Sequence, residues 1–203
     1  MIFLPKLTYD YGDLSPYISM ETMWVHHTKH HQKYVDNTNQ LMTILQDSRL
    51  DSQVRSALMP RLSFNLSGHI NHSIFWKMLS PRSYGRYNLD PKSSLYLQIK
   101  LDFGSFSRFE SLLKSEALNL NGSGWVALGW DNTTGRLFIY SFTGQDRSYF
   151  SSTSIILLID IWEHAYYLDY RSDKKRYMTE IWEVLDWSYC LNRFNKATKR
   201  IDR

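Results

Sequence analysis

The spacing of apolar residues predicts that the chain begins with a pair of helices. Apolar side chains recur at helical intervals over residues 21–47, which contain neither Gly nor Pro, and again over residues 52–79. Ser19 or Glu21 stands where a cap is expected before the first stretch, and Ser80-Pro81 ends the second. We therefore expect an antiparallel helical hairpin.

The C-terminal half combines helix and strand patterns. A third helix is predicted over residues 92–116, with a break near Gly104. Apolar runs bounded by turn residues predict strands at residues 124–130, 136–142 and 155–159. Helical periodicity then resumes from about Glu163 and continues to the C-terminus.

A change in composition separates the two halves. Residues 82–91 are rich in Ser, Gly, Asn and Pro, which is typical of a linker. We expect a helical hairpin domain at residues 1–84 and a mixed α/β domain at residues 85–203. The expected fold class is α+β, with the antiparallel hairpin followed by an α/β domain that holds a three-stranded antiparallel sheet.

Composition favours a globular protein, because hydrophobic residues make up 43% and charged residues 22% of the chain. The net charge is +4, and the basic residues are scattered apart from two short clusters, at residues 174–176 and 196–203. This pattern is typical of solvated helix faces rather than of nucleic-acid binding, although a positive field would also steer a small anion. No apolar run approaches the ~18 residues of a membrane span, so we expect no membrane partner. We see no secretory signal and no Arg-rich leader, and expect either that none exists or that this is the mature form.

The first candidate for chemistry is a histidine-rich run. Residues 26–31 hold four of the seven histidines, and Cys190 is the single cysteine, which excludes an intramolecular disulfide. Residues four apart share a helix face, so His26, His30 and Tyr34 form one stripe, with His27 and His31 about 100° away. A polar helix face rich in His is the alternative interpretation, which four histidines in six residues disfavour.

A second candidate is His72, which has Gly68 four residues before it and Trp76 four residues after it. A Gly inside a helix costs about 1 kcal/mol relative to Ala, so another group is expected to use the space that it leaves. A lone His in such a place is more often a core residue that bonds the backbone.

The third candidate is the pair Asp160 and His164, which follows the apolar run of the last predicted strand. Alone, Asp160 fits equally well as a helix cap. Taken together, the three candidates bring three imidazoles and one carboxylate from separate elements, a set that suits Fe, Mn or Zn better than Ca or Mg. The lack of further thiols argues against an Fe–S cluster or a structural zinc site.

These segments resemble the iron/manganese superoxide dismutase family over nearly the whole chain. The matching motifs are Leu4-Pro5 with Tyr9-Asp10-Tyr11, His26-His27-x-Lys29-His30-His31-x-x-Tyr34-Val35, Phe64-Asn65, Gly68-His69-Ile70-Asn71-His72-Ser73-Ile74-Phe75-Trp76, Gly122-Ser123-Gly124-Trp125 and Asp160-x-Trp162-Glu163-His164-Ala165-Tyr166-Tyr167. The resemblance implies metal ligands at His26, His72, Asp160 and His164, with a solvent molecule as the fifth ligand. It implies one Mn ion per subunit, with Fe as the alternative, and conversion of superoxide to dioxygen and hydrogen peroxide as the metal alternates between +3 and +2.

The resemblance also implies roles around the metal. His30 and Tyr34 match the residues that guard the access funnel and relay protons, and Trp125 and Trp162 match the walls of the cavity. The manganese class has Gly at position 68 and a glutamine from the strand region, which is Gln145 here. Gly68 would then make room for Gln145.

Glu163 and Tyr167 match residues that reach across the family's dimer interface, where they would bond the partner's His164 and the partner's His30. The resemblance therefore implies a homodimer or a homotetramer. The start of the chain resembles mature mitochondrial forms, so we expect the mitochondrial matrix, with bacterial cytoplasm as the alternative.

Four departures from the family pattern bear on the cavity wall and on the position of Gln145. They are Ala127, Ser67, the stretch 147–152 and Asp169. The divergent stretch and the basic tail leave a second hypothesis open: the chain is a dismutase-fold structural subunit of a larger assembly, such as a mitochondrial ribosome. Only under this hypothesis do we expect a nucleic-acid partner. A zinc hydrolase is a third reading, but it lacks an evident general base beside the open position.

Overall fold

The structure is a computed structural model that describes residues 1–146 and 152–199. Most of the divergent stretch after Gln145, residues 147–151, and the end of the basic tail, residues 200–203, lie outside the described residues. Among the described residues, no helix is both long enough and apolar enough to cross a membrane.

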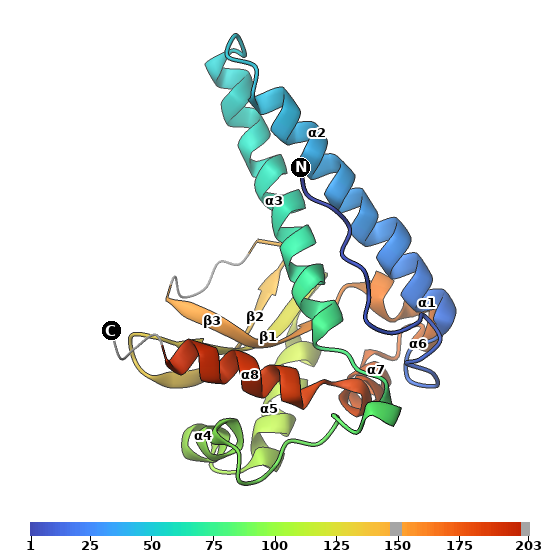
Figure 1. Ribbon diagram of the computed structural model, residues 1–203, viewed down its shortest axis with the longest axis vertical. Helices are drawn as coiled ribbons and strands as arrows, with labels where there is room; N and C mark the ends of the chain where they lie inside the picture. Colours follow the sequence, from blue (N-terminus) through green and yellow to red (C-terminus); the bar gives the residue numbers. More distant parts are fainter. Residues whose placement is uncertain (147–151, 200–203) are drawn as a thin grey trace.

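A long helical hairpin forms the N-terminal part and projects from the rest of the molecule (Figure 1). Its first arm is continuous and consists of α1 (Met20–Val25), the π-helical stretch η1 (His26–His31) and α2 (Gln32–Leu45). Its second arm is α3 (Ser52–Lys77). The predicted hairpin is confirmed, and Ser19 caps it, since its hydroxyl oxygen accepts a bond from Thr22 N (3.1 Å).

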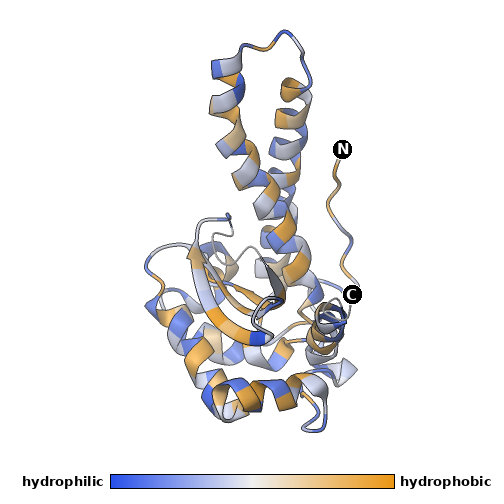
Figure 2. Cartoon of the chain, turned by 90° about the vertical axis from the view of Figure 1, so that its left-hand side faces the viewer, coloured by the Kyte–Doolittle hydropathy of each residue, from blue (hydrophilic) through white to orange (hydrophobic). Residues whose placement is uncertain are grey.

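The π-helical stretch is a feature that the apolar pattern did not predict. A π-turn replaces the usual i→i+4 backbone bonds with i→i+5 bonds over only a few residues, which is too short a stretch for apolar periodicity to reveal. It covers all four histidines of the run, and π-turns are frequent at functional sites. Figure 2 shows that both arms of the hairpin carry hydrophobic and hydrophilic residues in alternation, as expected for amphipathic helices.

The C-terminal part contains an antiparallel sheet with the strand order β2-β1-β3. The strands are β1 (Gly124–Asp131), β2 (Arg136–Thr143) and β3 (Thr153–Asp160). The central strand β1 is buried along its whole length, which agrees with its apolar sequence. The register pairs Trp125 with Asp160, so the sheet itself sets these two residues side by side. The expected α+β class with a three-stranded antiparallel sheet is confirmed.

Short helices surround the sheet in the C-terminal half (Figure 1). Before it come η2 (Arg82–Tyr84), α4 (Ser94–Phe103) and α5 (Phe106–Asn119), with the predicted break at Gly104, where φ is 86°. After it come η3 (Glu163–Ala165), α6 (Tyr167–Tyr170), α7 (Lys174–Glu180), η4 (Ile181–Val184) and α8 (Trp187–Thr198). The C-terminal helical pattern is therefore divided into short pieces, because Asp173 and Asp186 each begin a new helix with a side-chain cap.

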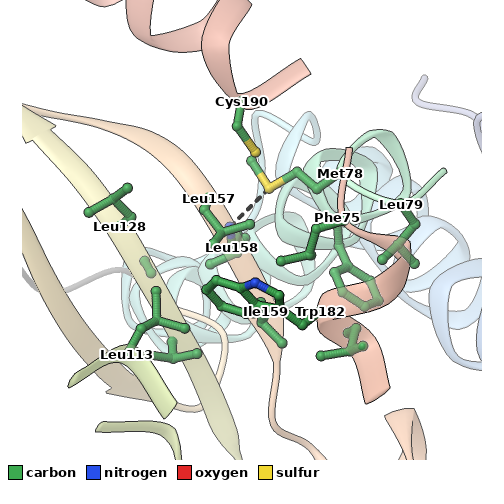
Figure 3. Packing of buried hydrophobic residues seen from close by; sticks show 14 of the residues in the cluster. Phe75, Met78, Leu79, Leu113, Leu128, Leu157, Leu158, Ile159, Trp182 and Cys190 are labelled. Carbon is green, nitrogen blue, oxygen red and sulfur yellow. Dashed lines mark hydrogen bonds between the residues drawn. The ribbon is translucent and has the colours of Figure 1, made fainter. Parts of the chain in front are cut away.

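One hydrophobic core joins the end of the hairpin to the C-terminal half. Figure 3 shows Phe75, Met78 and Leu79 facing the apolar side chains of β3, with Cys190 of α8 close by. The backbone continues this contact, since Ser80 N donates to Val184 O (2.8 Å) and Asp186 N donates to Met78 O (2.8 Å). The second arm is thereby anchored within a few residues of His72, which fixes that histidine relative to the sheet.

Candidate metal centre

Four polar side chains from four different elements converge at the base of the hairpin. His26 comes from η1, His72 from α3, Asp160 from the end of β3 and His164 from η3. One potential ligand atom from each lies within 4.8 Å of every other. Asp160 Oδ2 is at the centre, 3.1 Å from Nε2 of His26, 3.5 Å from that of His72 and 3.3 Å from that of His164.

The hydrogen bonds around these groups leave ring nitrogens without partners. His26 and His72 are buried, and within the described residues the Nε2 atom of each lacks a hydrogen-bond partner. A buried polar atom in this state is costly unless some other group pairs with it. His72 Nδ1 donates to Gly68 O (2.6 Å), so the neutral ring keeps a lone pair on Nε2, which lies 3.5 Å from Asp160 Oδ2. His72 is therefore both a backbone-bonded core residue and a candidate ligand.

The electrostatics of the cluster keep His26 and His72 neutral and the carboxylate of Asp160 ionised. Burial lowers the pKa of His26 to about 4 and holds the pKa of His72 well below its usual value. Burial alone would raise the pKa of Asp160, but His164 and His26 beside it keep that pKa below the ordinary range. Neutral imidazole nitrogens and a carboxylate oxygen fit Mn, Fe or Zn, so the residues present suit the metal that the family resemblance implies.

Gln145 lies beside the cluster in a defined orientation. Its Oε1 accepts a bond from Trp125 Nε1 (3.0 Å), and because an indole nitrogen can only donate, this contact fixes which end of the amide faces which way. Its Nε2 consequently donates to the Tyr34 hydroxyl (2.9 Å). Asn71 Nδ2 holds the Gln145 backbone carbonyl (2.8 Å). The chain thus places Gln145 between two of the residues expected to line the cavity.

The ring of Tyr34 lies against Gly68. A Cβ atom at Gly68 would lie 2.7 Å from Cδ1 and 2.9 Å from Cε1 of Tyr34. The Tyr34 ring packs against the glycine and its hydroxyl accepts from Gln145, while the expectation that Gly68 makes room for Gln145 stays a prediction. Sequence spacing did not reveal this, because it depends on how closely α2 and α3 approach.

Two further expected residues lie against His164. The His30 ring stacks on the His164 ring with centroids 4.3 Å apart, and the Trp162 ring stacks on His164 at 5.5 Å. Trp162 Nε1 also donates to Gly144 O (3.3 Å), next to Gln145 in sequence. Glu163 and Tyr167 are exposed on the same segment, and their expected contacts with a partner subunit stay predictions.

The other histidines of the run serve the packing around the site. His27 bonds the Tyr11 hydroxyl (2.9 Å) and Pro5 O (2.9 Å), while His31 lies between Trp76 Nε1 (2.8 Å) and His69 Nδ1 (2.8 Å). All the members of these two networks belong to the quoted family motifs, but their roles were not predicted.

Sequence reasoning missed two residues that hold site groups in place. Asn71 had a signal, since it directly precedes His72 in the motif. Tyr177, whose hydroxyl donates to the Asp160 carbonyl (2.9 Å), had none, because it lies in α7 and reaches Asp160 only through the tertiary fold.

Two family models match the chain. Residues 2–80 match the alpha-hairpin domain of iron/manganese superoxide dismutases. Residues 91–193 match the C-terminal domain of the same enzymes. The first match contains His26 and His72, and the second contains Asp160 and His164. On these two matches and the convergence of those four side chains, the chain belongs to the iron/manganese superoxide dismutase family.

Proposed function

We propose that this protein is a manganese-preferring superoxide dismutase that holds one metal ion per subunit through His26, His72, Asp160 and His164. The observation that carries the proposal is the convergence of these four side chains, with buried Nε2 atoms on His26 and His72 that lack hydrogen-bond partners among the described residues. When bound, the metal would supply one-electron chemistry between its +3 and +2 states. Superoxide as the substrate follows from the family.

The protein side chains supply a largely buried site that carries one negative charge, on Asp160. Asp160 and His72 are fully buried, and His26 is nearly so. In such surroundings the carboxylate of Asp160 is the single anion among the four proposed ligands, and it offsets part of a cation's charge where water does not screen it. The hydrogen bond from Trp162 N to Asp160 Oδ1 (2.9 Å) leaves Oδ2 directed at the imidazoles.

Reduction of superoxide to peroxide also requires protons, and we assign their delivery to Tyr34 and His30. Because Gln145 Nε2 donates to the Tyr34 oxygen, the phenolic proton is free to be donated elsewhere. Burial, with the Asp160 charge adding to it, raises the pKa of Tyr34 to about 12, so the phenol keeps its proton at neutral pH. Burial, with the neighbouring His164 adding to it, lowers the pKa of His30 to about 4, so its ring is neutral at neutral pH.

The preference for manganese rests on Gln145. The resemblance associates a glutamine from the strand region with the manganese class, and Gln145 lies buried between Trp125 and Tyr34. Three neighbouring groups bond it, so its amide is held in one orientation, as a group that tunes a metal through hydrogen bonding must be.

We further propose a homodimer or homotetramer in the mitochondrial matrix. The exposed positions of Glu163 and Tyr167, within three residues of His164 in the chain, support a subunit interface next to the metal. The location rests on the resemblance of the chain start to mature mitochondrial forms, with bacterial cytoplasm as the alternative.

The test is the rate of superoxide consumption per bound metal ion, measured on the same sample loaded with Mn or with Fe. We expect a rate constant of roughly 10⁸–10⁹ M⁻¹s⁻¹ with Mn, and its loss together with the bound metal in His72→Ala. Activity with Fe alone would support the proposed dismutase activity but contradict the manganese preference. An inert protein, with or without metal, would reject the enzyme and favour the structural subunit.

A further inference from the structure

The segment that follows His164 is tied to the start of the helix that carries His26. Asp169 Oδ2 accepts a hydrogen bond from the backbone N–H of Ser19 (2.9 Å). The next residue, Tyr170, makes a second bond to the same N-terminal segment: its hydroxyl donates to the backbone carbonyl of Tyr17 (2.5 Å). Two adjacent side chains thus hold one short segment of the N-terminal region.

Ser19 is the cap of the first hairpin arm. Its hydroxyl oxygen accepts a bond from Thr22 N (3.1 Å), and Thr22 is itself buried. The helix continues from here into η1 without a break, so the position of Ser19 fixes that of His26, about two turns along. A carboxylate beside a first helical turn is also favoured by the helix dipole.

The other end of this connection leads to the sheet side of the metal centre. Asp169 lies in α6, which directly follows η3 and its His164. The ring of Tyr170 lies 5.8 Å from that of Tyr177, whose hydroxyl donates to the Asp160 carbonyl (2.9 Å). The Asp169–Tyr170 pair therefore connects the elements that carry His26, His164 and Asp160.

A backbone outlier marks the same place. Arg171 follows the pair with φ 53° and ψ −128°, a conformation that L residues rarely adopt. Such strain persists where the surrounding structure holds the chain on both sides, and it tends to occur at functional sites. Here Asp169 and Tyr170 hold the chain before Arg171, and Asp173 caps α7 after it.

We propose that Asp169 is a positioning residue for the metal centre, because its bond to Ser19 sets where His26 lies relative to His164. The inference rests on the proposed function, since it concerns the geometry of the ligands named there. Asp169 acts through the helix start rather than on the metal or substrate.

The experiment measures Mn²⁺ binding by the full-length protein, by competition with a chelator, together with the electron paramagnetic resonance spectrum of bound Mn²⁺. We expect Asp169→Ala to weaken Mn²⁺ affinity about 10- to 100-fold and to change the spectrum. Asp169→Asn should recover most of the affinity and the wild-type spectrum, because its amide oxygen still accepts from Ser19 N.

Ser105→Ala is the control. Ser105 also accepts a backbone bond at a helix start, from Arg108 N (3.0 Å), but it caps α5, which carries none of the proposed ligands. We expect this variant to lose stability while it keeps the wild-type Mn²⁺ affinity and spectrum. If Ser105→Ala weakens Mn²⁺ binding as much as Asp169→Ala does, general destabilisation explains both effects and the proposal is overturned.

The remaining outcomes separate this inference from the proposed function. Wild-type affinity in Asp169→Ala, alongside loss of binding in His72→Ala, overturns the positioning role and leaves the function intact. A wild-type protein that binds no Mn²⁺ overturns both. If Asp169→Ala does not fold, Tyr170→Phe keeps the ring but removes the bond to Tyr17, and it must weaken Mn²⁺ binding measurably for the proposal to stand.

Discussion

Gly68→Ala is the substitution whose effect the packing of the hairpin predicts most directly. In an unobstructed helix this change stabilises by about 1 kcal/mol. Here the new Cβ would lie 2.7 Å from Cδ1 of Tyr34, and two more ring carbons would lie 2.9 Å away. Since carbon atoms pack best at about 3.5–4.0 Å, the ring must move by about 1 Å.

The cost of that movement exceeds the gain in helix propensity. Overpacking of this kind costs about 1–3 kcal/mol, and displacement of the ring also weakens the Gln145–Tyr34 hydrogen bond (2.9 Å), worth about 1 kcal/mol. Set against the gain of about 1 kcal/mol, the expected result is a net destabilisation of about 1–3 kcal/mol. Activity should also fall, because the hydroxyl of Tyr34 is displaced.

The assay is urea unfolding of the metal-free protein in two backgrounds. In Tyr34→Ala the ring is gone, so Gly68→Ala should there be stabilising by about 1 kcal/mol, and the coupling between the two sites is then about 2–4 kcal/mol. Ser67→Ala, one residue earlier in α3, controls for helix propensity and should behave alike in both backgrounds. If Gly68→Ala stabilises the protein equally with and without the Tyr34 ring, the packing argument is wrong.

Three further predictions concern the surroundings of the site. Burial lowers the pKa of His31 to about 2, whereas the unfolded chain binds that proton near pH 6.5, so the free energy of unfolding is highest above pH 6.5 and falls below it by up to about 1.4 kcal/mol per pH unit. Urea unfolding of metal-free His31→Gln should therefore show a shallower decline in stability between pH 6.5 and 4. An unchanged slope would contradict this. Trp125→Phe removes a buried donor to Gln145 Oε1 (3.0 Å); it should destabilise the protein by about 1–3 kcal/mol and lower dismutase activity. Trp130→Phe, in the same strand, is the control and should leave activity unchanged. Addition of Mn²⁺ at 100 times its Kd should raise the free energy of unfolding by about 2.7 kcal/mol, a gain that His26→Ala should abolish; equal gains in both proteins would show that the ion binds elsewhere.

Particular residues show what the sequence by itself determined. The apolar period gave both arms of the hairpin, and Ser19 gave the cap, because these signals act over a few neighbouring residues. The break at Gly104 and the strands β1 and β2 were predicted for the same reason. The motifs around His26, His72, Asp160 and His164 named the residues that the fold brings together, because the side chains that hold a metal are restricted to a few types at characteristic positions.

The tertiary structure alone decided how those side chains are held. No local sequence pattern predicts four features: the π-helical stretch, the packing of the Tyr34 ring against Gly68, the bond from Tyr177 to Asp160 and the bond from Ser19 to Asp169. The three side-chain contacts depend on the approach of elements that are separated in the chain, by 150 residues in the case of Ser19 and Asp169. Such contacts follow from how whole faces pack, and local periodicity carries no information about them.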